Sequence, residues 1–503
     1  MRPQQLQTNS VWTPITLPCG RTVRNRLAKV ALYEHLAVFN GGPPNDYHFA
    51  LYSEWGRHDW GMIFTGNVQV SSDHLTFGRD ITVPDEITDE ALAPYKQLAV
   101  LMQGSGVSAE QPSRALAIAQ LSHTGRQSLN FLGGRGLQPP LGVSPVRVGA
   151  DVASPGLFSE GLYRVLFSVP KEMSLDDIEH VISRFVHGAR VAHLSGFDGV
   201  EIHAAHGYLL AQFISPKSNH RKDEFSLEHG DDLRVLRTVV SRIREAVPAD
   251  FVLGIKLNVA DYSGTQSLSD KETRVLSHIR AIAQWGGVDF IEMSGGDYES
   301  PGRQAFFSRM SQKCMEVLEE MPRTISSPPL PLVMLTGGLR TPALIDSALS
   351  NKHAQLVGIG RPAVVCPNLP TVLREMGDDS SKWPNTLFAP EPSLSRPKLF
   401  ELPGFNRVWN SLPRISLIGA GVNVSWYEVS LRYLAEKVWD PKKTYPDYSV
   451  GAFGGLIYMW TFTVTKPATK SQRPESSALY LSLQSIFFLA VFSFAGSYLF
   501  GQR

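Results

Sequence analysis

Two imidazoles and a phenol follow one apolar segment closely enough to act on the same small molecule. Residues 197–202, FDGVEI, read as a buried strand, and His203, His206 and Tyr208 come directly after it. In a parallel α/β protein, catalytic groups are expected where a buried strand ends, because the loops there carry function on a rigid scaffold. We therefore expect these three side chains to converge on one small ligand.

A polar loop completes this pattern, because residues 215–224 read SPKSNHRKDE. The whole segment 196–225 resembles the old yellow enzyme family of FMN-dependent oxidoreductases. The resemblance is to the branch with a His-x-x-His pair followed two residues later by Tyr. It implies that His203 and His206 bind the carbonyl oxygen of the substrate, and that Tyr208 donates a proton as general acid.

Two other interpretations of the histidine pair compete with this one. His-x-x-His can be half of a metal site, but a catalytic zinc needs a third protein ligand. No His-Glu-x-x-His motif or Cys pair accompanies it, so we predict no metal. An isolated histidine at a strand end is by default a hydrogen-bonded structural residue, and the combined pattern argues against that default.

Bulk properties restrict the class of protein. The 503 residues are 43% hydrophobic and 19% charged, with a formal net charge of +1, so no basic stripe supports nucleic-acid binding. Cys19, Cys314 and Cys366 lie in no metal or redox motif, which suggests a reducing compartment. The first residues lack the apolar core of a secretory signal. We expect a cytoplasmic protein.

Eight apolar runs alternate with longer amphipathic stretches, such as Ser174–Leu194 and Asp231–Val247, where Ser174 and Asp177 form a helix cap. This alternation predicts a (β/α)₈ TIM barrel, with residues 15–26 as an N-terminal hairpin cap. A doubly wound sheet alternates too, but no Gly-x-Gly-x-x-Gly turn follows the first strand. The runs span Leu27–Leu32, Gly61–Val70, Leu116–Leu121, Gly199–Ile202, Phe251–Val259, Phe290–Met293, Leu332–Thr336 and Leu356–Ile359.

Glycines follow the last two predicted strands, at Gly337 and Gly338 and again at Gly360, which precedes Arg361. Barrels commonly bind phosphate at this place, because glycine lets backbone amides approach the anion. Arg361 adds a charge-assisted bond. We predict that these four residues hold the phosphate of FMN.

The resemblance supplies candidates for the flavin ring. Gln120 matches the family's Gln at the end of the third strand, and an amide can contact both donor and acceptor edges of the flavin pyrimidine. Gly66 stands where the family has a small residue against the ring. Lys256 stands where the family usually has Arg beside flavin N1, so the charge is kept while the planar fork is lost.

The first strand departs from the family. Members tend to show a small residue, Pro and Met, and then Thr or Cys near flavin O4, whereas this chain reads KVALY from Lys29 to Tyr33. Backbone contacts of Val30 and Ala31 with the flavin survive such changes. Tuning of the flavin by the residue at Tyr33 is in doubt.

The implied function is an ene-reductase: NADPH or NADH reduces FMN, which then reduces the activated C=C bond of an enone-type small molecule, with ping-pong kinetics. Two alternatives remain open. A flavin-free barrel with a phosphate clamp is typical of a lyase or isomerase acting on a phosphorylated metabolite, with Lys256 as Schiff-base candidate. A catalytically idle, membrane-attached barrel is the other.

The end of the chain differs in composition. We predict a catalytic domain at 1–395, a linker and helical extension at 396–448, and a hydrophobic tail at 449–503. Residues 477–500 contain no charge and are long enough to cross a bilayer. This predicts a tail anchor with the enzyme on the cytoplasmic face of an intracellular membrane. The alternative is a helix docked on the barrel or in a homodimer interface.

Overall fold

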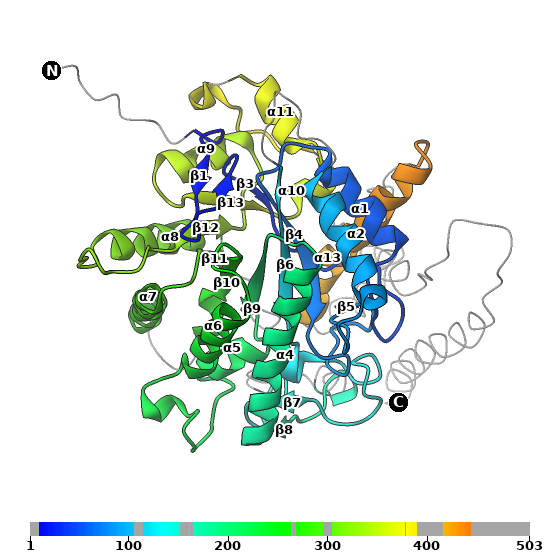
Figure 1. Ribbon diagram of the computed structural model, residues 1–503, viewed down its shortest axis with the longest axis vertical. Helices are drawn as coiled ribbons and strands as arrows, with labels where there is room; N and C mark the ends of the chain where they lie inside the picture. Colours follow the sequence, from blue (N-terminus) through cyan, green and yellow to red (C-terminus); the bar gives the residue numbers. More distant parts are fainter. Residues whose placement is uncertain are drawn as a thin grey trace, which may run out of the picture.

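Eight parallel strands close into a barrel at the centre of the molecule (Figure 1). The computed structural model describes residues 10–104, 114–150, 160, 164–262, 268–294, 304–377, 379–389 and 416–443. Strand β13 pairs with β3 through Val357 and Leu27, which joins the last strand to the first. In hydrogen-bonded order the strands are β3 (Leu27–Lys29), β4 (Met62–Gln69), β6 (Leu116–Ser122), β9 (Gly199–Ala204), β10 (Val252–Asn258), β11 (Phe290–Ser294), β12 (Leu332–Thr336) and β13 (Leu356–Ile359). The predicted (β/α)₈ barrel is confirmed.

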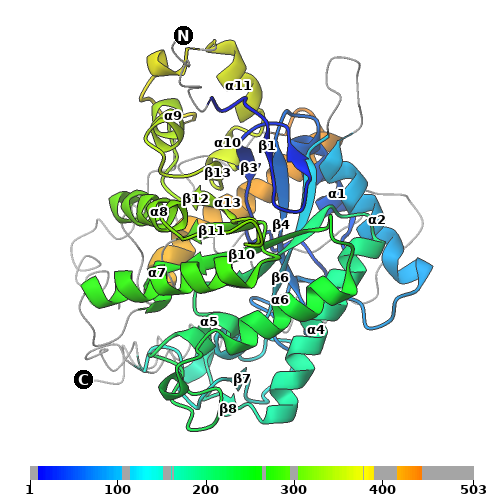
Figure 2. The ribbon, with the colours of Figure 1, turned by 60° about the vertical axis from the view of Figure 1, so that its left-hand side comes forward.

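Helices surround the strands, and Figure 2 shows α4, α6 and α7 crossing the same side of the barrel. Helix α4 begins at the predicted cap, where the Ser174 side chain accepts a hydrogen bond from the Asp177 amide. The helices are α1 (Asp46–Gly56), α2 (Asp89–Gln103), α4 (Leu175–Leu194), α5 (Leu209–Ile214), α6 (Arg234–Ala246), α7 (Leu268–Trp285), α8 (Gln304–Glu319), α9 (Pro342–Ser350), α10 (Pro362–Val365), α11 (Leu369–Glu375) and α13 (Ser416–Trp439).

The N-terminal hairpin was predicted correctly and closes the amino end of the barrel. Strands β1 (Ile15–Thr16) and β2 (Thr22–Val23) pair antiparallel. Leu17 and Val23 of the hairpin pack on the apolar side chains inside the barrel, including Phe64 and Phe290. Those two rings meet edge to face at 5.7 Å. The interior is therefore a packed core at this end, and only the opposite end is available for a ligand.

Two buried aspartates fasten the hairpin to the strands. Asp198 pairs with Arg21 of the hairpin at 2.7 Å and accepts a hydrogen bond from the Ala117 amide. Asp289 accepts one from the Cys19 amide at 2.7 Å and pairs with Arg244. Because a buried carboxylate without partners is costly, these bonds fix the position of the cap.

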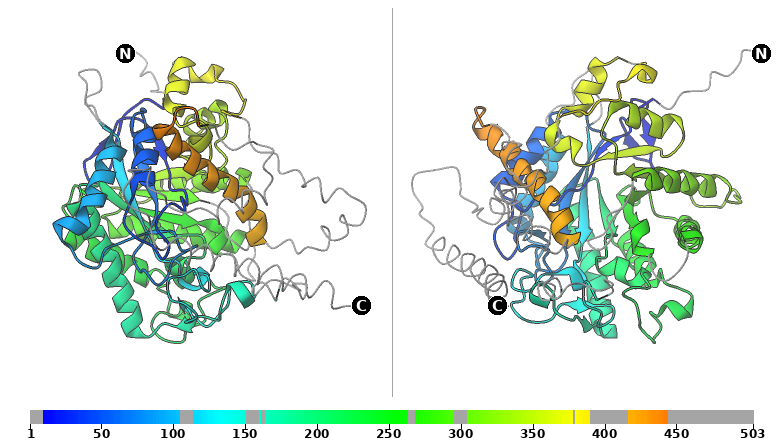
Figure 3. Two further views of the ribbon diagram at one scale, coloured as in Figure 1. Left: turned by 90° about the vertical axis from the view of Figure 1, so that its right-hand side faces the viewer. Right: turned by 180° about the vertical axis from the view of Figure 1, so that it is seen from behind.

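The structure describes one helix of the C-terminal extension, α13, which lies along α1 (Figure 3). The ring of Trp439 meets Tyr47 of α1 edge to face at 4.9 Å. Among the helices that are described, none is both long and apolar enough to span a membrane. The predicted membrane helix at 477–500 lies outside the described residues. It stays a prediction, as do the domain boundaries and the homodimer.

Replacing Asp198 by Ala should lower the free energy of unfolding by about 3 kcal/mol, because Arg21 and a buried backbone amide lose their partner. The matched control is Asp250→Ala, which removes the other carboxylate that pairs with Arg21. The Asp250 side chain is 60% exposed, against 1% for Asp198. Its loss should cost less than about 1 kcal/mol. Urea unfolding of both variants measures the difference, and equal losses would contradict the anchoring role.

Candidate active site

The structure brings His203, His206 and Tyr208 together at the carboxyl end of β9. His203 belongs to the strand, whereas His206 and Gly207 take left-handed backbone angles, with φ of 59° and 70°. This turn reverses the chain, and Tyr208 is the residue directly before α5. His203 Nε2 lies 2.9 Å from His206 Nδ1, and the ring of Tyr208 meets that of His203 edge to face at 4.6 Å.

Neighbouring strands hold each of these groups in place. His206 Nε2 lies 2.9 Å from the hydroxyl of Ser294, the last residue of β11. The Tyr208 hydroxyl accepts a hydrogen bond from the side-chain amide of Asn67 at 3.3 Å and lies 3.4 Å from Thr76 Oγ1. Ser294, Asn67 and Thr76 were not among the residues predicted from the sequence. For two of them position was the available signal, because Ser294 directly follows one predicted strand and Asn67 lies near the end of another.

Burial keeps both imidazoles neutral. It lowers the pKa of His206 to about 3, and the charge of Lys256 acts in the same direction. Burial, followed by the charges of His206 and Lys256, also holds the pKa of His203 well below its ordinary value. A neutral imidazole has one N–H donor and one acceptor. The pair can therefore offer hydrogen bonds to a ligand oxygen without carrying a positive charge.

A buried charged cluster lies beside the pair, on three adjacent strands. Lys256 of β10 is aligned with both His203 and Glu292, and its Nζ lies 2.7 Å from Glu292 Oε1. Burial opposes the charge of Lys256, but attraction to Glu292 and then Glu201 outweighs it and raises the lysine pKa. Gln120 of β6 donates a hydrogen bond to Glu201. The sequence analysis predicted Gln120 and Lys256 but missed the two glutamates, which looked like interior strand residues.

Burial and the neighbouring charge of Glu292 raise the pKa of Glu201 well above its ordinary value. Among the residues described, Glu201 Oε1 has no hydrogen-bond partner. A protonated carboxyl is a donor as well as an acceptor. The cluster therefore presents a lysine ammonium, an amide and a carboxyl from three adjacent strands, β10, β6 and β9. This is a suitable set for the mixed donor and acceptor edge of a flavin pyrimidine.

The predicted phosphate residues lie on adjacent loops after β12 and β13. Gly337 and Gly338 both have positive φ, and a Cβ added at Gly337 would meet no atom within 4 Å. Just before them, Thr336 Oγ1 is buried without a hydrogen-bond partner in the described part of the chain. Arg361 follows Gly360, and its guanidinium lies 5.8 Å from the ring of Tyr427. Open space and donors together fit an anion.

The three cofactor-binding residues predicted at the first strand have different surroundings. Val30 is buried in the barrel interior, and Ala31 is partly buried beside it. The Tyr33 hydroxyl lies 3.4 Å from Asp80 Oδ2, in the loop after β4, and 3.2 Å from Nδ1 of the nearby His35. Tyr33 is therefore engaged by protein groups on the side of the mouth.

Gly66 has a structural explanation of its own. Its amide donates a hydrogen bond to Glu34 Oε1 at 2.8 Å. A Cβ at this position would collide with the Glu34 carboxylate and with the carbonyl oxygen of Leu32. Internal packing thus already requires glycine here, and contact with a cofactor stays a prediction.

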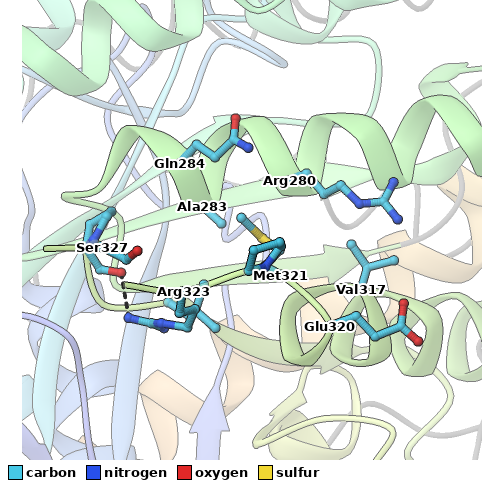
Figure 4. Close-up of a pocket in the computed structure, with 11 residues that line it drawn as sticks. Arg280, Ala283, Gln284, Val317, Glu320, Met321, Arg323 and Ser327 are labelled. Carbon is cyan, nitrogen blue, oxygen red and sulfur yellow. Dashed lines mark hydrogen bonds between the residues drawn. The ribbon is translucent and has the colours of Figure 1, made fainter. Parts of the chain in front are cut away.

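A surface hollow elsewhere has no part in this arrangement. It is lined by residues near the ends of α7 and α8, among them Arg280, Glu320 and Arg323 (Figure 4). From there the chain enters the amino ends of β11 and β12. The hollow is thus at the opposite end of the barrel from His203.

Comparison with known proteins decides the family. The sequence profile of the NADH:flavin oxidoreductase / NADH oxidase family matches residues 10–378. The chain belongs to this family. It is 36% identical over 395 residues to an NADH-dependent flavin oxidoreductase of Neonectria, covering 75% of this chain and 49% of the relative. It is 34% identical to another from Talaromyces variabilis, covering 71% of this chain and 84% of the relative.

Solved structures agree on the fold. The old yellow enzyme homologue of Zymomonas mobilis aligns with a TM-score of 0.57 at 22% identity, covering 73% of this chain and 93% of that one. Morphinone reductase aligns with a TM-score of 0.58 at 19% identity, covering 77% and 93%. This flavin oxidoreductase is thus an FMN enzyme dependent on NADH or NADPH, as predicted.

The neutrality of the histidine pair can be tested directly. Because burial depresses both pKa values, the imidazole NMR signals of His203 and His206 should not shift between about pH 5 and pH 8, where free imidazole titrates. Assigned signals of the labelled protein, with imidazole added as the reference, give the measurement. A titration of either residue near pH 6.5 would contradict the buried, neutral arrangement.

Proposed function

We propose that this flavin oxidoreductase reduces the activated C=C bond of α,β-unsaturated carbonyl compounds. The observation that carries the proposal is the convergence of two neutral imidazoles and a phenol beside the Lys256–Glu292–Glu201 cluster. When bound, FMN would supply the redox chemistry, a hydride transfer from the nicotinamide to the β-carbon of the substrate. The protein's part is to bind, orient and protonate.

The histidines would bind the carbonyl oxygen. Their ring nitrogens now contact each other and Ser294. A substrate oxygen would take over an N–H that these contacts share, so the pair must turn slightly when the ligand enters. Once turned toward the oxygen, these donors would stabilise the negative charge that develops on it. Because the imidazoles are neutral, they do so without fully protonating the enolate.

Tyr208 would donate the proton to the α-carbon. Contacts with Asn67 and Thr76 hold its hydroxyl in place, and its ring rests against His203. The same side chains that bind the oxygen thus position the acid. The hydrogen-bond donors and the proton donor therefore lie on one short segment of the chain.

The site residues fit the cofactor. We assign the pyrimidine edge to Gln120 and Lys256, and the phosphate to Gly337, Gly338, Gly360 and Arg361. Unpartnered oxygens of Glu201 and Thr336 lie at these two places among the described residues. Val30, Ala31, Tyr33 and Gly66 would border the ring on the strand-one side. We infer that NADH is the donor, because the fungal relatives that are 34–36% identical are named NADH-dependent.

The Schiff-base alternative is disfavoured by the charge state of Lys256. A lysine nucleophile needs a lowered pKa so that its amine is neutral. Attraction to Glu292 and Glu201 raises this pKa instead. The lysine is therefore suited to hold a negative charge rather than to attack a carbonyl.

The purified protein should be yellow and should lose its visible absorption band when NADH is added without oxygen. Adding 2-cyclohexenone should restore the band and yield cyclohexanone. Stopped-flow absorbance follows both steps, and NADPH serves as the comparison donor. A protein that is reduced but never reoxidised by any of a panel of enones would overturn the ene-reductase proposal.

Two sets of variants separate the proton donor from the oxygen-binding pair. Tyr208→Phe should leave reduction by NADH unchanged and slow reoxidation by an enone about 10²- to 10⁴-fold, the usual effect of losing a general acid. His203→Ala combined with His206→Ala should leave FMN bound but weaken phenolic ligands. A colourless double variant would mean instead that the histidines build the cofactor site.

A further inference from the structure

Helix α13 lies outside the family-matched region, which ends at residue 378, yet it is built into the catalytic domain. All side chains from Ser425 to Leu431 are buried, so this half of the helix is covered on every side. The helix lies along α1 and touches α10, which begins directly after Arg361 (Figure 3). A segment outside the family-matched region therefore packs beside the barrel mouth.

Two residues of α13, Tyr427 and Glu428, lie near residues of the predicted site. The Tyr427 ring faces the guanidinium of Arg361 at 5.8 Å. Glu428 is only 6% exposed and has no hydrogen-bond or ion-pair partner among the described residues. Its electrostatic neighbours are Asp80 and Tyr33. A buried carboxyl without a partner is unusual, because burial of a lone charge is costly.

Asp80 connects this carboxyl to the proton donor. It accepts hydrogen bonds from Gln69 Nε2 at 3.1 Å and from the Thr76 amide at 3.0 Å. The Thr76 hydroxyl lies 3.4 Å from the Tyr208 hydroxyl. Asp80 is therefore linked to Tyr208 through one residue, Thr76, and Glu428 interacts electrostatically with Asp80. We call these two carboxyls the wall.

At neutral pH this wall carries one negative charge. Burial raises the pKa of Asp80 to about 6, and burial together with Asp80 raises that of Glu428 to about 8. His35 is neutral, since burial and Arg79 lower its pKa to about 3. The other ionisable groups around the wall are Tyr33 and Tyr208, with Arg361 on the far side of Tyr427. Neither carboxylate has a cation paired to it in the described part of the chain.

We propose that Glu428 and Asp80 make the substrate pocket selective for molecules that carry a protonated amine remote from the oxygen held by His203 and His206. The inference rests on the proposed function, because it takes the ligand oxygen to bind at the histidines. Glu428 is thus a specificity-determining residue contributed by the C-terminal helix. A protonated amine gives the wall the partner that the protein itself does not provide.

Three phenols of similar size test the inference on the full-length, FMN-loaded enzyme: tyramine, which is cationic, 4-ethylphenol, which is neutral, and 4-hydroxyphenylacetate, which is anionic. Their dissociation constants are measured from the flavin absorption change at pH 7 and pH 9. The tyramine amine stays largely protonated, because alkyl amines titrate near pH 10. Ratios between the phenols cancel the ionisation of the phenol group itself.

The wild-type enzyme should bind tyramine more tightly than 4-ethylphenol, and the anion most weakly. Glu428 ionises as the pH rises through about 8, so the preference for tyramine should grow about fivefold or more between pH 7 and pH 9. Glu428→Gln should abolish this growth. Asp80→Asn removes one charge and also lowers the pKa of Glu428, which Asp80 helps to raise. The preference should therefore change less between pH 7 and pH 9 than in the wild type.

Glu436→Gln is the matched control, because Glu436 lies on the same helix but pairs with Arg432 and Lys443. It should behave like the wild type. Equal binding of the three phenols, a pH-dependent preference that survives in Glu428→Gln, or its loss in Glu436→Gln would overturn the inference while leaving the proposed function intact. A wild-type enzyme that binds FMN but none of the phenols would instead refute the proposed function.

Discussion

Closure of the barrel is the constraint on which the site depends. Pairing between β13 and β3 makes all eight carboxyl ends share one rim. Residues separated by hundreds of positions therefore lie near the same rim, as Tyr33, His203 and Arg361 do. The opposite end is filled by the hairpin and by apolar side chains such as Phe64 and Phe290. One end of the barrel is thus devoted to stability and the other to chemistry.

Buried charges inside the barrel are a second constraint on the site. The resemblance led us to expect a cation beside flavin N1, and the structure pairs that cation, Lys256, with Glu292. Both side chains are almost fully buried, and Glu201 with its raised pKa lies next to them. In the proposed arrangement, the ion pair offers less positive charge to the reduced flavin than a lone arginine would. The neighbouring strand β11 thus supplies the carboxylate that pairs with Lys256.

Much of this could be read from the sequence. Each of the eight strands is where its apolar run placed it, because a strand buried on both faces leaves a continuous hydrophobic signal. His203, His206 and Tyr208 could be selected together because they lie within six residues of each other. Asn67, Thr76 and Ser294 were missed because single polar residues in or near strands, far apart in the sequence, carry no joint pattern. Gly66 was assigned to the cofactor, although packing against Glu34 is sufficient to require it.

Helix α13 marks the limit of that approach. Its residues showed only a change in composition, and nothing local indicates that Glu428 reaches Asp80. Contacts of this kind depend on how an added segment docks on a finished barrel. The predicted tail at 477–500 lies outside the described residues, so the sequence remains the basis for that expectation.

The pairing of Leu27 with Val357 also has a consequence for biosynthesis. On the ribosome, β3 emerges early, while its partner β13 is translated last among the barrel strands. At about 5–20 residues per second, the nascent chain carries an unpaired apolar edge for some tens of seconds. The amino-terminal hairpin also depends on a partner that is translated late, because Asp289, which binds the Cys19 amide, lies 270 residues after it. Molecular chaperones that shield exposed strands are therefore expected to matter most for this protein before its synthesis is complete.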